Sequence, residues 1–454
     1  MKKWMIPVLA LLLCAGCADK SAAEAGRKPA ETESAAEEAQ TEEAEKEEPA
    51  EDESAEDAPE ETGETEISED APAPEKSFGA AKQARDVENN GGNFVRVGNR
   101  VYFRNYCEGG LPETALFGKF LGIAEEHPTS VWYYDEETGK AEHAFDDNGC
   151  GPLWYGECGF YLTAVRDEQT ESFFYPEDGG KAEELGRGIV RGVSEDGQYA
   201  AFWSAEGNGG PDTLSVLKGT ESAASAVPEG VNYTEFCGMA GPETVWLCHG
   251  DDGDSVWELD GKTGELLCLG LVPSAVEYSW AEMEQFVPDG DDFYLMLAWY
   301  EGTGHFLADY ACLKGTFGQE DSLALEDVPF NPDRADVENP PKILLTGPGE
   351  VMPVERTGRE VELTDYDSGD LIWCDSPFSA VKLIPGFISK APYDGGDRII
   401  QAAEIAGDAA YLIVAYVEPA PEEDIGWRTA YRSKGVEYLR VPLLDDSTAE
   451  HLLP

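Results

Sequence analysis

The chain has 454 residues, of which 92 are Asp or Glu and 32 are Lys or Arg, so its formal net charge is −60. This charge argues against binding nucleic acid, which needs Lys and Arg to displace the counterions of phosphates, and against lying flat on anionic lipid. Cationic ligands, metal ions and neutral glycans stay compatible with it, and solubility at an exposed cell surface is the simplest explanation.

The first predicted element is an export signal peptide in residues 1–16. Lys2 and Lys3 supply the positive start, residues 4–13 form an apolar stretch too short to span a bilayer, and small residues precede Cys17. A buried N-terminal helix or a true membrane span is the alternative. The segment resembles the lipobox of bacterial lipoproteins, with Cys14 where that family usually has Leu. The resemblance implies that Cys17 becomes an acylated N-terminus that anchors the protein in the cell membrane, on the extracytoplasmic side.

Residues 17–90 are predicted to form a disordered acidic tether. Residues 18–76 contain 23 acidic and five basic residues, no Phe, Trp or Tyr, and one large aliphatic residue, Ile67. Such a segment cannot bury enough apolar surface to offset the entropy of ordering it. A flexible chain of this length has an end-to-end distance of roughly 40–45 Å, and repulsion between the glutamates extends it further. We expect a spacer that lifts a folded domain, residues 91–454, away from the membrane.

The folded domain is predicted to consist of repeated β-hairpins. Seven times, two short runs rich in β-branched and aromatic residues are joined by a turn containing Gly, which supplies the backbone angles that tight turns need. These hairpins occupy residues 94–104, 153–164, 189–203, 234–248, 284–297, 343–355 and 399–417. A weaker second hairpin follows in most repeats, at residues 132–145, 257–269, 363–374 and 431–441.

The spacing of these hairpins predicts an all-β fold, a seven-bladed β-propeller. Their mean step is about 50 residues, which matches four strands per unit at the usual length of a propeller blade. Six blades are the alternative count. A pair of β-sandwiches is the alternative architecture, because irregular short strands can also form sandwiches, but alternating inner and outer hairpins favour blades.

Two of the turns carry a family resemblance. Ser194-Glu195-Asp196-Gly197 and the shifted copy Pro288-Asp289-Gly290 resemble the repeat of TolB-type propellers. Segments with an aromatic residue, Asp, two variable residues and Thr-Gly resemble the outer hairpins of those repeats, and also the repeats of quinone-type propellers. The chain as a whole resembles an exported β-propeller lipoprotein of Gram-positive bacteria. The resemblance implies an architecture and carries no chemistry.

One end of the propeller is predicted to carry the long loops. If each blade has strands a, b, c and d from the axis outward, the b–c and d–a connections share one end, and the a–b and c–d turns share the other. The longer connections are residues 105–130, 204–212, 249–254 and 418–426 between b and c, and 273–282, 329–342 and 375–398 between d and a. Binding usually resides in long loops on a rigid scaffold, so we expect this wide-loop face to be the binding face.

Candidate binding residues on the wide-loop face are mostly aromatic. Aromatic side chains there could stack on sugars or hold a partner peptide, although each could instead pin its own loop to the propeller. The candidates are Phe117, Phe120, His249, Trp280, Arg334, Tyr393, Arg398 and Trp427. Asp251-Asp252-Gly253-Asp254 has the oxygen density of a calcium site but lacks the spacing of a known calcium loop, so no metal site or cofactor is assigned beyond a possible calcium ion.

The cysteines give no framework for disulfides. Eight remain after Cys14 and Cys17, and they include neither a CxxC pair nor a His cluster that would indicate zinc. Their sequence separation makes Cys150 with Cys158, and Cys237 with Cys248, the first pairs to test in an exported protein.

Signals for catalysis are weak. The chain contains no Gly-x-Ser-x-Gly elbow, no His-Glu-x-x-His stretch and no phosphate-binding loop. The sequence therefore favours a membrane-tethered module that binds a surface protein, peptide or glycan, with no assigned catalytic residue. The alternative is a glycan-active hydrolase or lyase that uses two carboxylates near the propeller channel, which a separation of roughly 5–10 Å would indicate.

Overall fold

The computed structural model describes residues 86–453 except 107–128, 148, 167–168, 206–211, 252, 274–279, 302–305, 331–340, 355–359, 364–368, 377–378, 389–395, 420–430 and 445–446. By contacts between residues, the chain divides into two units, and every described residue belongs to the unit that contains residues 83–454. The described residues contain strands and turns, and no helix among them is long and apolar enough to cross a membrane. The described chain begins at Asp86, before the predicted domain boundary at residue 91.

The strands of the first half form four antiparallel sheets, each built from strands that are consecutive in the chain. The first sheet contains β1 (Val87–Glu88), β2 (Phe94–Val97), β3 (Arg100–Asn105), β4 (Ser130–Asp135) and β5 (Lys140–Asp146). The second contains β6 (Gly149–Gly156), β7 (Gly159–Arg166), β8 (Gln169–Pro176) and β9 (Glu183–Arg187). The third contains β10 (Ile189–Val193), β11 (Tyr199–Ala205), β12 (Asp212–Lys218) and β13 (Glu221–Ala226). The fourth contains β14 (Val231–Ala240), β15 (Glu243–Gly250), β16 (Gly253–Asp260) and β17 (Leu266–Leu271).

The second half continues this pattern with one interruption. One sheet contains β18 (Trp280–Asp289), β19 (Asp292–Glu301), β20 (Phe306–Thr316) and β21 (Ala324–Leu325). Two smaller sheets follow: β22 (Lys342–Gly347) with β23 (Glu350–Val354), and β24 (Glu360–Leu363) with β25 (Leu371–Ser376) and β26 (Ser379–Ile384). The last contains β27 (Arg398–Ala406), β28 (Ala409–Pro419), β29 (Tyr431–Pro442) and β30 (Glu450–His451).

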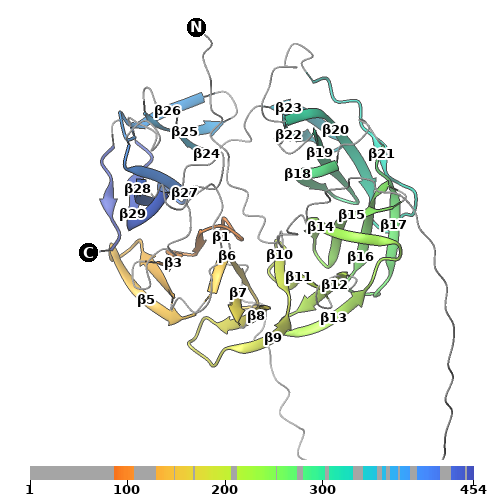
Figure 1. The fold of residues 1–454 in the computed structure, drawn as a ribbon, viewed down its shortest axis with the longest axis horizontal. Coiled ribbons are helices and arrows are strands. Elements are labelled where there is room, and N and C mark those ends of the chain that lie inside the picture. The colour runs from red at the N-terminus through yellow and green to blue at the C-terminus, as the bar shows by residue number, and fades with distance from the viewer. Residues whose placement is uncertain are drawn as a thin grey trace, which may run out of the picture. The chain divides into compact units, whose positions relative to one another are not determined.

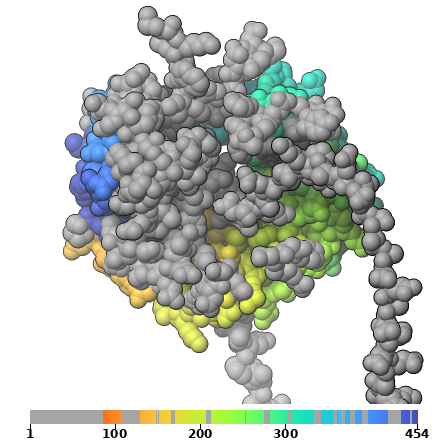
Figure 2. Space-filling view, viewed as in Figure 1, coloured from red at the N-terminus to blue at the C-terminus, as the bar shows by residue number. Residues whose placement is uncertain are grey.

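The sheets follow one another around a common centre, with the first strand of each nearest to it (Figure 1). In the space-filling view, the second, third and fourth sheets abut from yellow to green along the lower rim (Figure 2). This arrangement is a β-propeller, as the hairpin spacing predicts. We number the blades 1 to 7 in chain order and count β22 to β26 together as blade 6.

Buried side chains join each blade to the next in chain order, and also join blade 7 to blade 1. The described residues contain seven clusters of buried hydrophobic side chains, and each cluster lies between two consecutive blades, including blades 7 and 1. The seven clusters connect the eight sheets from β24–β26 through blade 7 and blades 1 to 5 to β22–β23, so each cluster marks one contact between neighbouring sheets. We call each such contact a seam.

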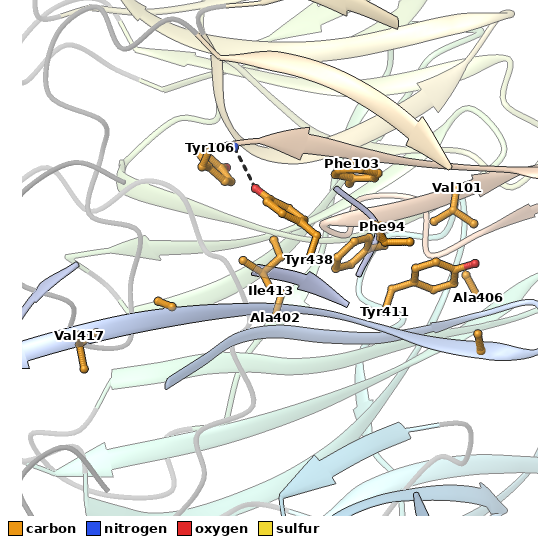
Figure 3. Close-up of a cluster of buried hydrophobic side chains, with 13 residues drawn as sticks. Phe94, Val101, Phe103, Tyr106, Ala402, Ala406, Tyr411, Ile413, Val417 and Tyr438 are labelled. Carbon is orange, nitrogen blue, oxygen red and sulfur yellow. Dashed lines mark hydrogen bonds between the residues drawn. The ribbon is translucent and has the colours of Figure 1, made fainter. Parts of the chain in front are cut away.

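The central strands of a blade place side chains in two seams, one on each face of the sheet, which explains why their sequences are continuously apolar. In β28, Tyr411 and Ile413 face blade 1, while Leu412 and Val414 face blade 6. Successive residues of a strand point to opposite faces, so a strand buried on both faces has no polar alternation. Figure 3 shows the cluster at the seam between blades 7 and 1, where rings from β2, β3, β28 and β29 pack together.

All seven inner hairpins are confirmed, and six of their turns have Gly at a positive φ, whereas the turn of blade 2 has Glu157 and Cys158 there, at +48° and +62°. Gly98 and Gly290, for example, take the positive φ angles of +65° that a side chain disfavours. In the turn of blade 3, Asp196 accepts hydrogen bonds from Ser194 Oγ and the Gln198 backbone N–H. The resemblance to the TolB-type repeat thus rests on residues that build a turn.

Three predicted elements of the later blades are wrong. Residues 431–441 are not a hairpin but part of the single strand β29. A bulge leaves Lys434 unpaired, while the residues before and after it both pair with β28. Residues 375–398 are not only a connector, since they contain β26, which pairs with β25. Residues 249–254 are not a long insertion, because β15 and β16 pair up to Gly250 and Gly253.

Blade 6 is divided, which departs from the predicted four-stranded unit. Among the described residues, β22 and β23 pack beside blade 5, whereas β24 to β26 pack against blade 7, and no buried cluster joins β23 to β24. Pro353 in β23 has no N–H to donate to a neighbouring strand, which suits the edge of a sheet. The propeller is thus continuous through seven seams and least continuous within blade 6.

Candidate functional site

The wide-loop face is the end at which strand a of each blade begins and strand b ends. Blade 4 presents the best-described part of this face. There, β14 begins at Val231, β15 ends at Gly250, and Gly253 starts β16.

A stacked aromatic pair stands at this end of blade 4. Tyr233 and His249 are cross-strand partners of β14 and β15, and their rings stack with centroids 5.5 Å apart and planes 20° apart. Tyr233 is 40% exposed, which is unusual for a large aromatic residue in a strand. The pair therefore presents a flat aromatic surface of the kind on which a sugar ring or a planar group can stack.

Carboxylates hold this surface in place. His249 Nδ1 lies 2.8 Å from Asp254 Oδ1, and the pair is about one-fifth exposed. Asn232 Nδ2 donates to Asp251 Oδ1 at 2.8 Å, which links the start of β14 to the turn after β15. Because Asp254 engages Nδ1, the imidazole has a defined orientation, and Nε2 is left to interact outside this pair.

Glu235 lies beneath the stacked pair, on the same face of β14 as Tyr233. Its Oε2 accepts a long hydrogen bond, 3.4 Å, from the backbone N–H of Met283 on β18 of blade 5. Burial raises the pKa of Glu235 to about 7, the Met283 N–H and His249 oppose this rise, and the neighbouring Glu282 and Glu284 add to it. A carboxyl group that titrates near neutral pH can donate or accept a proton there.

Glu284 is a second, half-buried carboxyl group close to Glu235. It accepts a hydrogen bond of 2.5 Å from Tyr300 Oη, and burial raises its pKa as well. Glu235 and Glu284 thus lie on the innermost strands of two adjacent blades.

Polar side chains on the innermost strands recur as caps of the neighbouring blade. Gln285 of blade 5 accepts from the Ile343 N–H at 2.8 Å and donates to the Ile343 carbonyl at 3.0 Å. Glu404 of blade 7 accepts from the backbone N–H groups of Asn93 and Phe94. Glu235 makes the same kind of contact with Met283, but with the longest hydrogen bond, so it caps its neighbour least completely.

The described residues include two of the predicted binding side chains, His249 and Arg398. Arg398 begins β27; its guanidinium lies 5.8 Å from the Phe387 ring centroid, and its Nε is 3.9 Å from Asp397 Oδ1. No contact joins it to His249 among the described residues. Trp280 begins β18, but its side chain lies outside the description. The remaining predictions lie outside the described residues: Phe117, Phe120, Arg334, Tyr393 and Trp427.

The proposed calcium ligands have other partners in this structure. Asp251 binds Asn232, Asp254 binds His249, and Asp252 lies outside the described residues. Within the described part of the chain, no group of three His, Cys, Asp or Glu side chains has the arrangement of a metal site.

The Cys237–Cys248 disulfide is absent, since both residues are free, buried thiols. Cys237 is the bulged residue of β14, while Cys248 pairs across the sheet with Thr234. Cys158 is a free and exposed thiol, so the predicted Cys150–Cys158 pair is wrong as well.

Tyr233 and Glu235 are the site residues that sequence reasoning missed. Tyr233 lies one residue before the predicted hairpin at 234–248, and the hydrogen bond of Glu235 is made with a residue 48 positions away. The sequence does contain a signal for Tyr233, because it is an aromatic residue, between Asn232 and Thr234, near the start of an innermost strand. The start of such a strand lies at the loop end of a blade. Nothing in the local sequence distinguishes Glu235 from the many other acidic residues.

No protein-family model and no curated protein matches this chain. Solved β-propeller structures do resemble it at low identity. The propeller domain of the Trilobed protease from Pyrococcus furiosus has a TM-score of 0.41 and 8% identity, with 81% of this chain and 97% of that chain covered. TolB from Acinetobacter baumannii has a TM-score of 0.31 and 9% identity, covering 78% and 66% of the two chains. A polysaccharide lyase has a TM-score of 0.39 and 10% identity, covering 78% and 90%. The arrangement of its own sheets, and not these comparisons, makes this protein a β-propeller.

Proposed function

We propose that this protein is a binding module held on the outer side of the cell membrane by lipid at Cys17, and that it captures a glycan or a peptide on its wide-loop face. The observation that carries the proposal is the stacked pair of Tyr233 and His249, in which Tyr233 is exposed and His249 is held by Asp254. Rigid aromatic surfaces bind sugars and peptides at little cost in conformational entropy.

The charge around this surface narrows the ligand class. Residues 219–313, which span blade 4 and most of blade 5, contain 18 Asp or Glu residues, one Lys and no Arg. A phosphorylated or sulfated ligand would be repelled there, so the ligand is a neutral glycan or a peptide without net negative charge.

Binding is tested with a glycan array and a pull-down from envelope extract, using the wild type, Tyr233→Ala and His249→Ala. We expect each variant to weaken binding at least tenfold, since one lost aromatic anchor costs about 1–2 kcal/mol or more. Leu325→Ala, which removes an exposed side chain from the outermost strand of blade 5, is the control and keeps full affinity. Equal affinities for all four proteins would refute the assignment of the face.

Membrane anchoring is tested separately with Cys17→Ser. The wild type should partition into detergent and carry acyl chains on its mature N-terminal peptide, as read by mass spectrometry, whereas Cys17→Ser should remain in the aqueous phase. A wild-type protein recovered from the cytosol with residues 1–16 attached would reject the anchoring.

Glu235 favours a second candidate function, a glycan-active enzyme. A carboxyl group with a pKa of about 7 can serve as a general acid at neutral pH, and Glu284 lies on the adjacent innermost strand. In that case Glu235→Gln abolishes turnover of a bound glycan but preserves its binding. Under the binding proposal, incubation of the bound glycan with wild-type protein yields no product.

A further inference from the structure

Among the described residues, blades 7 and 1 meet without a shared strand. Every described sheet contains strands that are consecutive in the chain, so no described strand from the C-terminal end joins blade 1 and none from the N-terminal end joins blade 7. At this seam, Tyr438 Oη donates to the Arg104 carbonyl at 2.7 Å. It also accepts from the Tyr106 N–H at 2.9 Å, as Figure 3 shows. The contact between blades 7 and 1 therefore depends on side chains and on any further segment that bridges these two blades.

Residues 86–93, which we call the N-terminal strap, bridge them. The strap enters as β1, which pairs with β2, and the Asp86 carbonyl accepts from the Gly98 N–H at 2.9 Å. Its contacts with blade 7 are extensive. Asn89 Nδ2 donates to the Ile405 carbonyl, Glu88 accepts from the Gly407 N–H at 2.8 Å, and Asn93 donates to Glu404 from both its backbone and side-chain nitrogens.

The same strap also bonds to blade 2. Asn90 exchanges two hydrogen bonds with the backbone of Tyr155, at 2.8 and 2.6 Å. The Gly91 N–H donates to the Leu153 carbonyl at 2.8 Å, and the Leu153 N–H donates to the Gly92 carbonyl at 3.0 Å. The strap therefore ties blades 7, 1 and 2 together along their innermost strands.

Two glycines show how closely the strap is held. A Cβ atom at Gly91 would lie 2.2 Å from the ring of Trp154, and one at Gly92 would lie 2.3 Å from Glu404 Oε2. Asn89 has a φ of +55°, a conformation that Asn tolerates better than most residues. The sequence Asn-Asn-Gly-Gly-Asn is thus matched to this position, although it looks like a flexible linker.

We propose that the strap is a releasable clasp of the ring. It is the first described segment after the acidic tether, so a pull on the tether acts on the strap before it acts on any blade. Detachment removes the bonds to blades 7 and 2 and opens the seam between blades 7 and 1, while each four-stranded sheet stays intact. The direction of pull rests on the proposed anchoring at Cys17, whereas the bridging role does not.

The bridging role is tested by hydrogen exchange on the full chain. Asn89→Gly with Asn90→Ala removes the side-chain bonds of the strap while permitting the positive φ at position 89. We expect exchange of amides in β27 and β6 to accelerate at least tenfold, because the double variant loses three hydrogen bonds. Asn232→Ala, which breaks an exposed Asn–Asp bond on blade 4, is the matched control and leaves β27 and β6 unchanged.

Force measurements test the release itself. With the wild-type chain pulled between its N- and C-termini, we expect an early, reversible lengthening of at most about 28 Å, the extended length of eight residues, before any blade unfolds. In the double variant this step occurs at lower force. A first event as long as a whole blade, or faster exchange spread evenly over all blades in the double variant, would overturn the proposal.

Discussion

Asn89 and Asn90 are neighbours in the chain, yet they bind to different blades. The Asn89 side chain donates to Ile405 of blade 7 at 2.6 Å, and the Asn90 side chain donates to Tyr155 of blade 2 at 2.8 Å. Both acceptors are backbone carbonyls of innermost strands. The carboxamide is well suited to this task because it can donate to a carbonyl and accept from an N–H at once. A segment with the composition of a linker thereby joins three blades.

The hydroxyl of Tyr438 is predicted to stabilise the same seam. Tyr438→Phe leaves the buried Arg104 carbonyl and Tyr106 N–H without this partner, so the free energy of unfolding should fall by about 1–3 kcal/mol. Chemical denaturation measures the change. Tyr133→Phe serves as the control, because the Tyr133 hydroxyl binds Glu142 in an exposed position, and its effect should stay within about 0.5 kcal/mol. Equal effects of the two substitutions would contradict the prediction.

Glu235 should make stability fall as the pH rises. Its pKa is about 7 in the folded protein and 4.5 ordinarily, so the folded state binds more protons than the unfolded state between these values. The free energy of unfolding therefore decreases from pH 4.5 to pH 7 and levels off above it. We expect the loss between pH 5 and pH 8 to be smaller in Glu235→Gln by on the order of 1–3 kcal/mol.

The control for this pH dependence is Glu142→Gln, which changes an exposed carboxylate on β5. Denaturation curves at both pH values should give it the same loss as the wild type. A Glu235→Gln protein with the wild-type loss would show that Glu235 titrates normally.

Thr244 is predicted to be the most sensitive position of a local motif. Its buried hydroxyl accepts from Trp246 Nε1 at 3.0 Å and donates to the Leu259 carbonyl at 3.2 Å. Thr244→Val keeps the shape but leaves both partners unpaired, which should cost about 1–3 kcal/mol of unfolding free energy. Thr346→Val, at an exposed hydroxyl, should change it by less than about 0.5 kcal/mol. The unfolding midpoints of the two variants give the comparison.

Thiol reactivity should follow burial. Cys158 is exposed, whereas Cys237, Cys248 and Cys312 are buried, and burial raises the pKa of their thiols, that of Cys312 to about 12. Brief alkylation of the native protein, followed by peptide mapping, should label Cys158 and leave the other three unmodified until denaturant is added. Rapid labelling of Cys237 or Cys248 in native protein would argue against the packing of blade 4.

Local sequence signals predicted most of the fold correctly. The seven inner hairpins are confirmed because turn residues and apolar runs lie next to each other in the chain. The Ser/Thr-Val-Trp motif is similarly local, since residues two apart share a face of a strand: Ser130 with Trp132, and Ser255 with Trp257, make the same bond as Thr244 with Trp246. This motif could have been found in the sequence and marks strands whose indole is held in place.

The errors arose where a distant strand changed the outcome. Residues 433–435 have the composition of a turn, but pairing along the whole length of β28 converts them into a bulge. Residues 379–384 have no strong hairpin signal, yet they become β26 beside β25. The candidate site behaves in the same way. His249 could be predicted from its position at the end of a blade. The role of Tyr233 depends on stacking with its cross-strand partner, and the role of Glu235 depends on its hydrogen bond with blade 5.

The order of residues along the chain was enough to establish the charge, the hairpins, their spacing and the propeller class, because these depend on interactions between near neighbours. The contact between blades 7 and 1, the division of blade 6, the stacked surface on blade 4 and the role of the strap arise from contacts across tens to hundreds of positions. Asn89 and Ile405 are separated by 316 residues, and a hydrogen bond of that range exists only once the blades between them have folded.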